Sequence, residues 1–234
     1  MNMIDKTKCK MKNWNPVIGC LHNCSYCWAK NLTETRLKSM PKYKDGFVTP
    51  KIVEIELNKR FRNQFVGVSM MGDLFGEWVP KEWILRVIDA TRNSPSSNFL
   101  FLTKNPNRYK GFVHSCRSNI VLGTTIETNR SNDFSKAPSA AERAQAMAEL
   151  TYEHKFVSIE PILDFDVDAF ANMIEGIAPE LIAVGYDNYH SNLPEPSLSK
   201  TLDLIERLSD FTEVRKRTLR PAHPQTLARI GGES

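Results

Sequence analysis

Short apolar runs alternate along the chain with longer stretches in which apolar residues recur at helical spacing. Six runs are nearly continuous in apolar character, which is typical of buried parallel strands. They cover 14–18, 65–71, 99–103, 120–126, 156–160 and 181–185. The stretches between them predict helices at 25–39, 81–93, 107–112, 140–150, 167–177 and 197–208. Strands that alternate with helices form right-handed βαβ units and a parallel sheet.

The number of repeats decides between a closed and an open barrel. A closed βα barrel needs eight strands, and this chain offers six. We therefore expect an α/β fold, an open (βα)6 partial TIM barrel with a parallel sheet. Functional groups gather at the C-terminal ends of the strands in such barrels. Polar residues follow all six runs, at 20–27, 69–73, 103–106, 124–129, 158–161 and 185–188.

Length and composition limit the class of protein. A chain of 234 residues suffices for one α/β domain but is short for two independent cores. We expect a single domain over 1–213 and a basic extension over 214–234. Hydrophobic residues at 41% and charged residues at 25% argue against disorder. No stretch is typical of a membrane span or a signal peptide, so we expect a cytoplasmic protein without a membrane partner.

Three of the five cysteines lie within eight residues, as Cys20, Cys24 and Cys27. An odd number of cysteines with three crowded together does not form a secreted disulfide framework. A zinc or ferredoxin-type site with four protein ligands needs one more thiolate, and Cys9 and Cys116 stand apart from the group in the sequence. The spacing therefore favours an iron–sulfur cluster with one open metal position, with half of a zinc site as the alternative.

The cysteine motif also resembles a known signature. C-x3-C-x-aromatic-C, with Tyr26 before the third cysteine, resembles the motif of the radical S-adenosylmethionine (radical SAM) superfamily. Further segments resemble a phage-associated radical SAM family of uncharacterised function that is related to the spore photoproduct lyase branch. The resemblance runs from about Trp14 to Asp187, and its segments are Trp14–Cys20, Ser69–Phe75, Leu102–Pro106 and Ser158–Pro161.

The resemblance implies a cofactor and a reaction. The three cysteines would hold a [4Fe–4S] cluster whose fourth iron binds S-adenosyl-L-methionine (SAM). Reductive cleavage of SAM would yield a 5′-deoxyadenosyl radical that abstracts hydrogen from a substrate. An external electron donor of the flavodoxin or ferredoxin type would supply the electron. The protein itself would supply ligands, orientation and a dry pocket.

The same resemblance suggests which residues bind SAM. Tyr26 would lie against the adenine. Ser69, Gly72 and Asp73 follow the second strand, where the superfamily has a Gly-Gly-Glu-like segment that receives the SAM ammonium group. This chain has Met71-Gly-Asp instead, and Asp73 could equally cap the following turn.

Three polar residues after later strands are further candidates. Thr125 and Glu127 alternate along the fourth strand and so face one side. The resemblance implies that polar groups leaving this strand hold the ribose; a surface ion pair is the alternative for Glu127. Glu160 lies in an apolar run and needs a partner. It would bind SAM or substrate, or pair with Arg143 or Lys104.

Two residues are weak candidates for a catalytic role. Cys116 could donate hydrogen in a radical relay, although its neighbours are typical of a surface turn. Tyr186 could line a substrate pocket with its ring and hydroxyl.

The charge pattern bears on the substrate. The net charge is +4, and Val214–Arg220 is the densest basic run. Together with the resemblance, this run suggests a nucleic acid or nucleotide substrate; a solvated final strand is its simpler interpretation. A peptide or small metabolite is the alternative substrate. From another class, the chain could be a non-catalytic, metal-stabilised nucleic-acid binding module, with Cys9 or His22 as fourth ligand.

Overall fold

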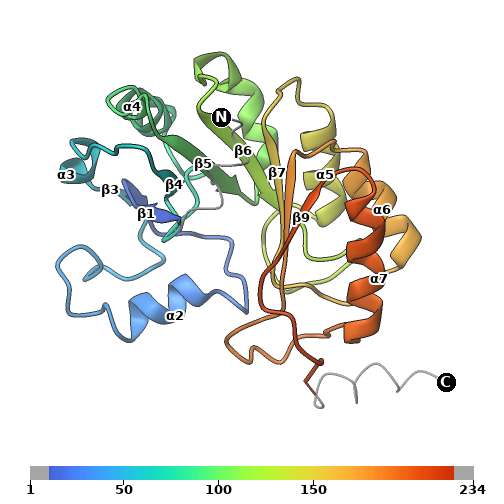
Figure 1. The fold of residues 1–234 in the computed structure, drawn as a ribbon. Helices are drawn as coiled ribbons and strands as arrows, with labels where there is room; N and C mark the ends of the chain where they lie inside the picture. Colours follow the sequence, from blue (N-terminus) through green and yellow to red (C-terminus); the bar gives the residue numbers. More distant parts are fainter. Residues whose placement is uncertain (1–10, 224–234) are drawn as a thin grey trace. The chain divides into compact units, whose positions relative to one another are not determined.

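The computed structural model describes residues 11–223 (Figure 1). Cys9 and the end of the expected C-terminal extension lie outside this range. The strands are β1 (Lys12–Trp14), β2 (Val17–Ile18), β3 (Lys51–Ile52), β4 (Phe65–Val68), β5 (Asn98–Thr103), β6 (Ile120–Thr125), β7 (Lys155–Ile159), β8 (Leu181–Val184) and β9 (Glu213–Lys216). The helices are α2 (Trp28–Glu34), α3 (Glu54–Leu57), α4 (Lys81–Thr91), α5 (Ala140–Ala148), α6 (Val167–Glu175) and α7 (Leu198–Ser209), with 3-10 turns η1 (Pro106–Gly111) and η2 (Val113–Ser115).

Seven of these strands form one parallel sheet. Their order is β1-β4-β5-β6-β7-β8-β9, so β1 and β9 are edge strands and the sheet is open. This confirms the expected α/β fold with an open, parallel partial barrel. The sheet has one strand more than the pattern predicted, because residues 213–216 pair in parallel with β8. This strand crosses the boundary expected between the domain and its C-terminal extension.

The described residues divide into two compact units. The first contains residues 11–123 together with 135–137, and the second contains 124–134 and 138–223. The division falls within β6, so the first unit holds the strands up to β6 and the second holds β7 to β9.

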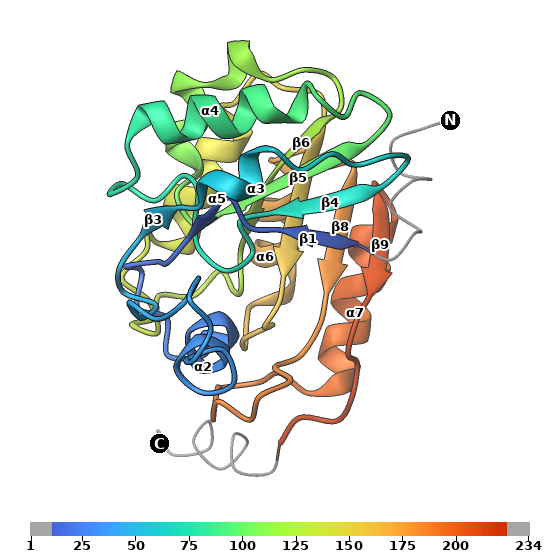
Figure 2. The ribbon, with the colours of Figure 1, turned by 90° about the vertical axis from the view of Figure 1, so that its left-hand side faces the viewer.

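In the first unit, the run predicted as one strand at 14–18 is divided in two. Pro16 has no backbone N–H to donate, and the chain turns there. β1 pairs with β4 in the sheet, whereas β2 leaves it and pairs antiparallel with β3. The Trp14 ring packs against Phe99 at 5.8 Å between centroids, and its Nε1 donates to the Glu56 carbonyl at 2.9 Å. Figure 2 shows β1, β4 and β5 side by side.

Two helices of the first unit are shorter or tighter than their patterns predict. The helix expected at 25–39 is α helical only over Trp28–Glu34. It ends where the Thr35 hydroxyl and N–H both bond the Asn31 carbonyl. The segment expected as a helix at 107–112 is the 3-10 turn η1, held by the Tyr109 hydroxyl, which lies 2.8 Å from the Phe101 and Gly123 carbonyls.

The second unit repeats the strand–helix pattern with regular helix ends. α5 starts with a capping box, in which Ser139 and Glu142 bond each other's backbone N–H groups. Asp166 precedes α6 without capping it, because its carboxylate pairs with Arg130. No helix within residues 11–223 has the length and apolarity needed to cross a bilayer.

Candidate functional site

Two glycines fix the start of the cysteine loop against the end of β4. Gly19 and Gly72 form a parallel bridge, and the Gly19 N–H donates to the Met71 carbonyl at 2.9 Å. Gly19 has φ +87°, and a Cβ there would lie 2.8 Å from the Pro50 Cα. A Cβ on Gly72 would lie 2.8 Å from the Gly19 carbonyl oxygen. Only glycine fits both positions, so the cysteine loop is held at the C-terminal end of the strand.

The three half-buried thiols of this loop lie close enough to influence one another. Burial raises the pKa of Cys20, and the nearby Asp73 carboxylate and the other two thiols raise it further. Burial also raises the pKa of Cys27, and Cys24 adds to that shift. Ionising three neighbouring thiols is costly without a cation, because each thiolate disfavours another negative charge nearby. The loop is therefore suited to a metal that neutralises the thiolates.

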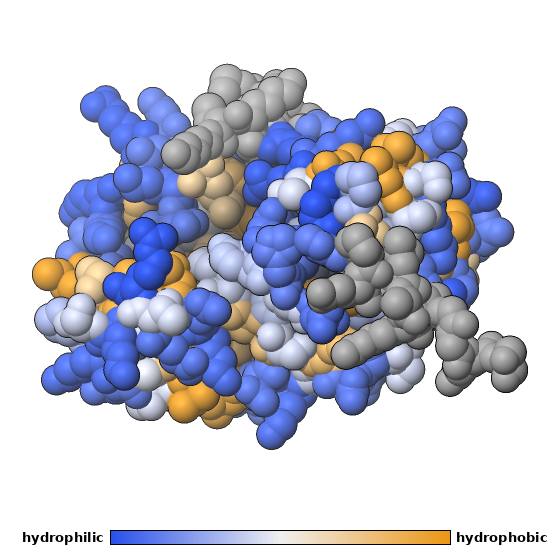
Figure 3. Space-filling model, turned by 90° about the horizontal axis from the view of Figure 1, so that it is seen from below, coloured by the Kyte–Doolittle hydropathy of each residue, from blue (hydrophilic) through white to orange (hydrophobic). Residues whose placement is uncertain are grey.

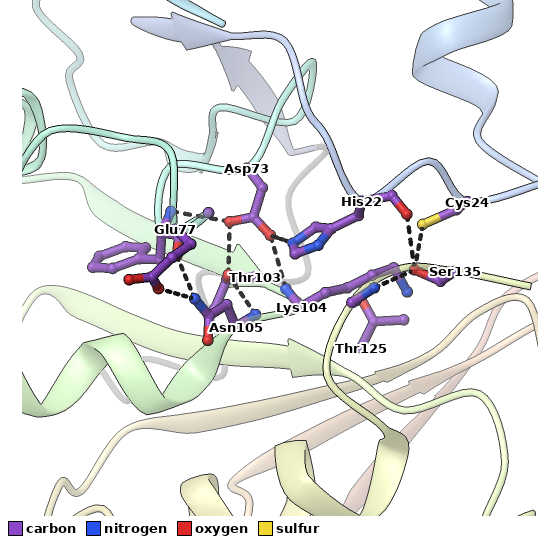
Figure 4. Close-up of polar contacts among 12 residues, drawn as sticks. His22, Cys24, Asp73, Glu77, Thr103, Lys104, Asn105, Thr125 and Ser135 are labelled. Atoms are coloured by element: carbon purple, nitrogen blue, oxygen red, sulfur yellow. Dashed lines mark hydrogen bonds and ion pairs between the residues drawn. The ribbon is translucent and has the colours of Figure 1, made fainter. Parts of the chain in front are cut away.

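Hydrogen-bond donors already point at two of these sulfur atoms. Cys27 is the N-cap of α2, and its Sγ accepts from the Lys30 N–H at 3.4 Å. The Ser135 hydroxyl lies 3.1 Å from the Cys24 Sγ and is the donor when that sulfur is a thiolate (Figure 4). Such donors stabilise negative charge on metal-bound sulfur.

The spacing of the sulfur atoms bears on the kind of metal site that the loop could form. A tetrahedral zinc with Zn–S bonds of about 2.3 Å holds its sulfur ligands about 3.8 Å apart. Among the residues that the structure describes, the three cysteine sulfurs do not all lie within 4.8 Å of one another. The three thiols are therefore not preset for a single zinc ion, and the chemistry of this donor set fits an iron–sulfur cluster.

His22 lies between Cys20 and Cys24, but its ring is used elsewhere. Its Nε2 lies 2.9 Å from the Asp73 Oδ2, and both side chains are buried (Figure 4). The ring also meets Trp78 edge-on, with centroids 4.8 Å apart. His22 thus attaches the cysteine loop to the segment after β4, and it does not fit the role of a fourth metal ligand.

The Asp73 carboxylate is surrounded by hydrogen-bond donors. Besides His22, it accepts from the Thr103 hydroxyl at 2.6 Å, the Lys104 N–H at 2.9 Å and the Phe75 N–H at 3.0 Å. Burial opposes ionisation, but these bonds and His22 overcome it and hold the pKa of Asp73 below its ordinary value. All four lone-pair positions of the carboxylate are occupied. This arrangement supports the turn-capping interpretation of Asp73 rather than direct binding of the SAM ammonium group.

Ser69 also has a structural partner. It is buried with φ +55°, and its hydroxyl accepts from the Val17 N–H at 3.3 Å. The Asn15 side chain accepts from the Met71 N–H at 3.0 Å. The side chains around this turn thus hold β2 and the end of β4 together, which favours a structural role for Ser69.

Tyr26 and Lys104 are brought together from distant parts of the sequence. The Lys104 Nζ lies 3.0 Å from the Tyr26 hydroxyl and 5.3 Å from the centre of its ring. Lys104 also acts on Cys27, whose pKa its charge lowers slightly against the larger effect of burial. A cation therefore lies beside both the predicted adenine contact and a predicted cluster ligand.

Cys116 lies far from this site along the strand direction. It precedes β6, whereas the cysteine loop is attached after β4 at the opposite ends of these parallel strands. Burial raises the pKa of Cys116 to about 12. A catalytic role remains a prediction that this placement does not support.

The second unit contains four of the predicted site residues: Thr125, Glu127, Glu160 and Tyr186. Thr125 ends β6, and Glu127 is buried in an ion pair with Arg143 at 2.8 Å. Tyr186 is fully buried, and its hydroxyl bonds Thr201 at 2.7 Å and Pro196 at 3.1 Å. These contacts favour structural roles for Glu127 and Tyr186.

Glu160 is half-buried, and its predicted role depends on the environment of its carboxyl group. Burial raises the pKa of Glu160, and the charge of Arg217 only partly offsets that effect. Within residues 11–223 its carboxylate has neither Arg143 nor Lys104 as an ion-pair partner. Its assignment to SAM or substrate remains a prediction.

The sequence did not identify the residues that contact the site from distant segments. Ser135 and Thr103 contact the site residues Cys24 and Asp73 from 111 and 30 residues away. Thr103 had one signal, its place at the end of an apolar run. Nothing in the pattern around Ser135 singles it out, because it lies in a polar loop.

Two of the three comparisons with known proteins found a match. The family model described as "Protein of unknown function (DUF5131)" matches residues 5–177, which is well over half of the 234 residues. The chain belongs to the DUF5131 family. No curated protein matches this DUF5131 chain.

Among solved structures, the DUF5131 chain is similar to a spore photoproduct lyase mutant with bound AdoMet and dinucleoside spore photoproduct. The TM-score is 0.55 at 13% identity, over 85% of the DUF5131 chain and 61% of the lyase chain. At this identity the likeness shows the fold alone. Neither comparison bears on the predicted association with phages.

Proposed function

We propose that this DUF5131 protein is a radical SAM enzyme with a [4Fe–4S] cluster on Cys20, Cys24 and Cys27. The observation that carries the proposal is the geometry of the cysteine loop. Three thiols of one loop lie at the C-terminal end of parallel strands, and hydrogen-bond donors lie at two of their sulfurs. The nearby histidine is bound to Asp73 instead of joining them.

The similarity to spore photoproduct lyase adds support from an independent direction. The sequence motifs resemble a radical SAM branch related to that lyase, and the fold resembles the lyase itself. When bound, the cluster and SAM would supply a 5′-deoxyadenosyl radical for hydrogen abstraction.

Several residues of the first unit would contribute to binding such a cofactor. The Lys30 N–H and the Ser135 hydroxyl stabilise two thiolates, and Tyr26 offers a ring for the adenine. Lys104 would attract the carboxylate of SAM, because its ammonium lies beside Tyr26 and acts on Cys27. Asp73 positions the loop through His22 rather than touching SAM.

For the substrate, we propose a nucleic acid or nucleotide. The support is the dinucleoside bound to the similar lyase structure. The basic run at 214–220 supports this substrate class less strongly than its composition suggests. Arg220 pairs with Glu195 at 2.6 Å and Arg215 with Glu213 at 3.3 Å, so both cations have partners within the second unit.

Anaerobic reconstitution with iron and sulfide tests the cofactor. We expect a [4Fe–4S] paramagnetic resonance signal that changes when SAM is added, and formation of 5′-deoxyadenosine with dithionite. Cys24→Ala should abolish both, whereas Cys116→Ala is the matched control and should keep both. A colourless protein that binds zinc and ignores SAM would refute the proposal.

A second assay tests the substrate. Binding of single-stranded DNA, RNA and nucleotides should be measured at several salt concentrations, because phosphate contacts weaken steeply with salt. Absence of binding to all three would leave a peptide or small metabolite as the substrate class.

A further inference from the structure

The surface outside the cysteine loop is both apolar and basic. We call the exposed residues of 21–48 the α2 face. Eight large hydrophobic residues are exposed among residues 11–223, and four of them lie on this face: Leu21 at 40%, Trp28 at 36%, Met40 at 46% and Val48 at 57% exposure. Figure 3 shows apolar atoms interspersed with polar atoms on the side that carries α2. Apolar residues set among charged ones are typical of a protein-binding surface.

The charge of this face is concentrated. Residues 28–48 contain five Lys and Arg residues and two acidic residues, a net charge of +3, whereas the whole chain carries +4. Arg36, Lys38 and Lys44 are exposed. Lys42 pairs with Glu56, and the charges of Lys51 and Lys44 both act on Asp45, but within residues 11–223 no carboxylate forms a salt bridge with Arg36 or Lys38. A basic field of this kind attracts acidic partners.

The segment that carries the α2 face also packs around the candidate cluster ligands. Cys20 and Cys27 pack against a core that includes Tyr43 and Phe47. The Cys20 N–H donates to the Phe47 carbonyl at 3.0 Å, and Val48, the next residue, is exposed. Trp28 directly follows Cys27. A protein bound on this face would therefore contact residues that directly adjoin the candidate cluster ligands and their packing partners.

We propose that the α2 face binds a small acidic one-electron carrier protein of the flavodoxin or ferredoxin type. This inference rests on the proposed function, since reductive cleavage of SAM consumes one electron. In the transfer the carrier is oxidised by one electron and the cluster is reduced by one, with no bond made or broken. The exposed aliphatic residues favour a protein partner over nucleic acid, whose phosphates require cations alone.

A pair of charge-reversal variants tests the proposal. Arg36→Glu/Lys38→Glu reverses two unpaired cations of the face. Arg60→Glu/Arg62→Glu is the matched control, because these two exposed arginines precede β4, at the end of that strand opposite the Gly72 bridge. The probe is flavodoxin, and the first measurement is its affinity for each purified protein, without a cluster, at low and high salt.

We expect the Arg36/Lys38 variant to bind flavodoxin about tenfold more weakly than the wild type at low salt, with a smaller salt dependence. The control should stay within about twofold. In reconstituted protein, reduction of the cluster by reduced flavodoxin should slow by a similar factor, while reduction by dithionite should not change.

Equal affinities for wild type and the Arg36/Lys38 variant, or an equal loss in the control, would overturn the inference. Loss of oligonucleotide binding without loss of flavodoxin binding would assign the face to nucleic acid and overturn it as well. The proposed function fails separately, if dithionite-reduced wild type makes no 5′-deoxyadenosine. Flavodoxin affinity is measured without SAM chemistry, so the two failures are distinguishable.

Discussion

The Asp73 carboxylate is the best place to test how the cysteine loop is held. Asp73→Asn keeps the shape of the side chain but removes its charge. The amide oxygen can still accept from the Phe75 N–H and the Thr103 hydroxyl. The amide NH2 group then faces the Lys104 N–H, which is left without an acceptor, and the charged bond to His22 is lost.

These losses set the size of the expected effect. An unsatisfied buried N–H costs about 1–3 kcal/mol, and a hydrogen bond to a charged group contributes about 1.5–3 kcal/mol. We therefore expect Asp73→Asn to lower the free energy of unfolding by about 3–5 kcal/mol. For a chain of this length each kcal/mol shifts Tm by about 2–4 °C, so the total is roughly 6–20 °C.

The effect should also depend on pH, with a defined sign. The pKa of Asp73 is lower in the folded protein than its ordinary value of 3.8. The stabilisation is therefore complete above pH 3.8 and is lost as the pH falls through the folded-state pKa. The difference between wild type and Asp73→Asn should be largest at neutral pH and should shrink below pH 3.8.

Urea unfolding of the reduced, metal-free protein at pH 7 and in acid measures both predictions. Asp89→Asn is the matched control, because Asp89 is exposed and its ion pair within residues 11–223 is with the neighbouring Arg92. Its effect should stay within about 0.5 kcal/mol. If Asp73→Asn is equally neutral at pH 7, the carboxylate does not hold the loop as described.

The remaining predictions concern cluster tuning, loop geometry and a buried ion pair. Ser135→Ala removes the hydrogen-bond donor to Cys24 and should lower the midpoint potential of the reconstituted cluster by about 40 mV, which is roughly 1 kcal/mol for one electron. A redox titration monitored by paramagnetic resonance measures this shift. An unchanged potential would contradict the hydrogen bond from Ser135 to Cys24. Gly19→Ala should prevent iron incorporation, measured by iron content, because no Cβ fits at its backbone angle. Glu127→Ala should lower the free energy of unfolding by about 3–5 kcal/mol in urea, since it breaks the buried ion pair with Arg143, whereas replacing both residues by apolar ones should cost much less.

The parts of the site that the sequence predicted are local. The cysteine spacing predicted a metal loop because three ligands on one short segment need no tertiary structure to be adjacent. The apolar runs predicted six strands of the sheet and therefore the end at which the loop lies. The same logic missed β9, because Glu213–Lys216 is polar and gains its place only by pairing with β8.

The roles of individual polar residues could not be assigned in that way. Asp73 read equally well as a SAM ligand or a turn cap, and contacts from His22, 51 residues earlier, and Thr103, 30 residues later, favour the second. Glu127 read as a ribose ligand or a surface ion pair, and the structure shows a buried ion pair with Arg143.

Residue order was enough to predict the fold class and a loop with three candidate metal ligands, because periodicity and spacing within a segment reflect local geometry. Tertiary structure alone decided which polar side chains are already saturated with partners, which cations remain exposed on the α2 face and which donors reach the cysteine sulfurs. A polar residue acquires its role from the groups that surround it, and those groups come from segments that only folding brings together.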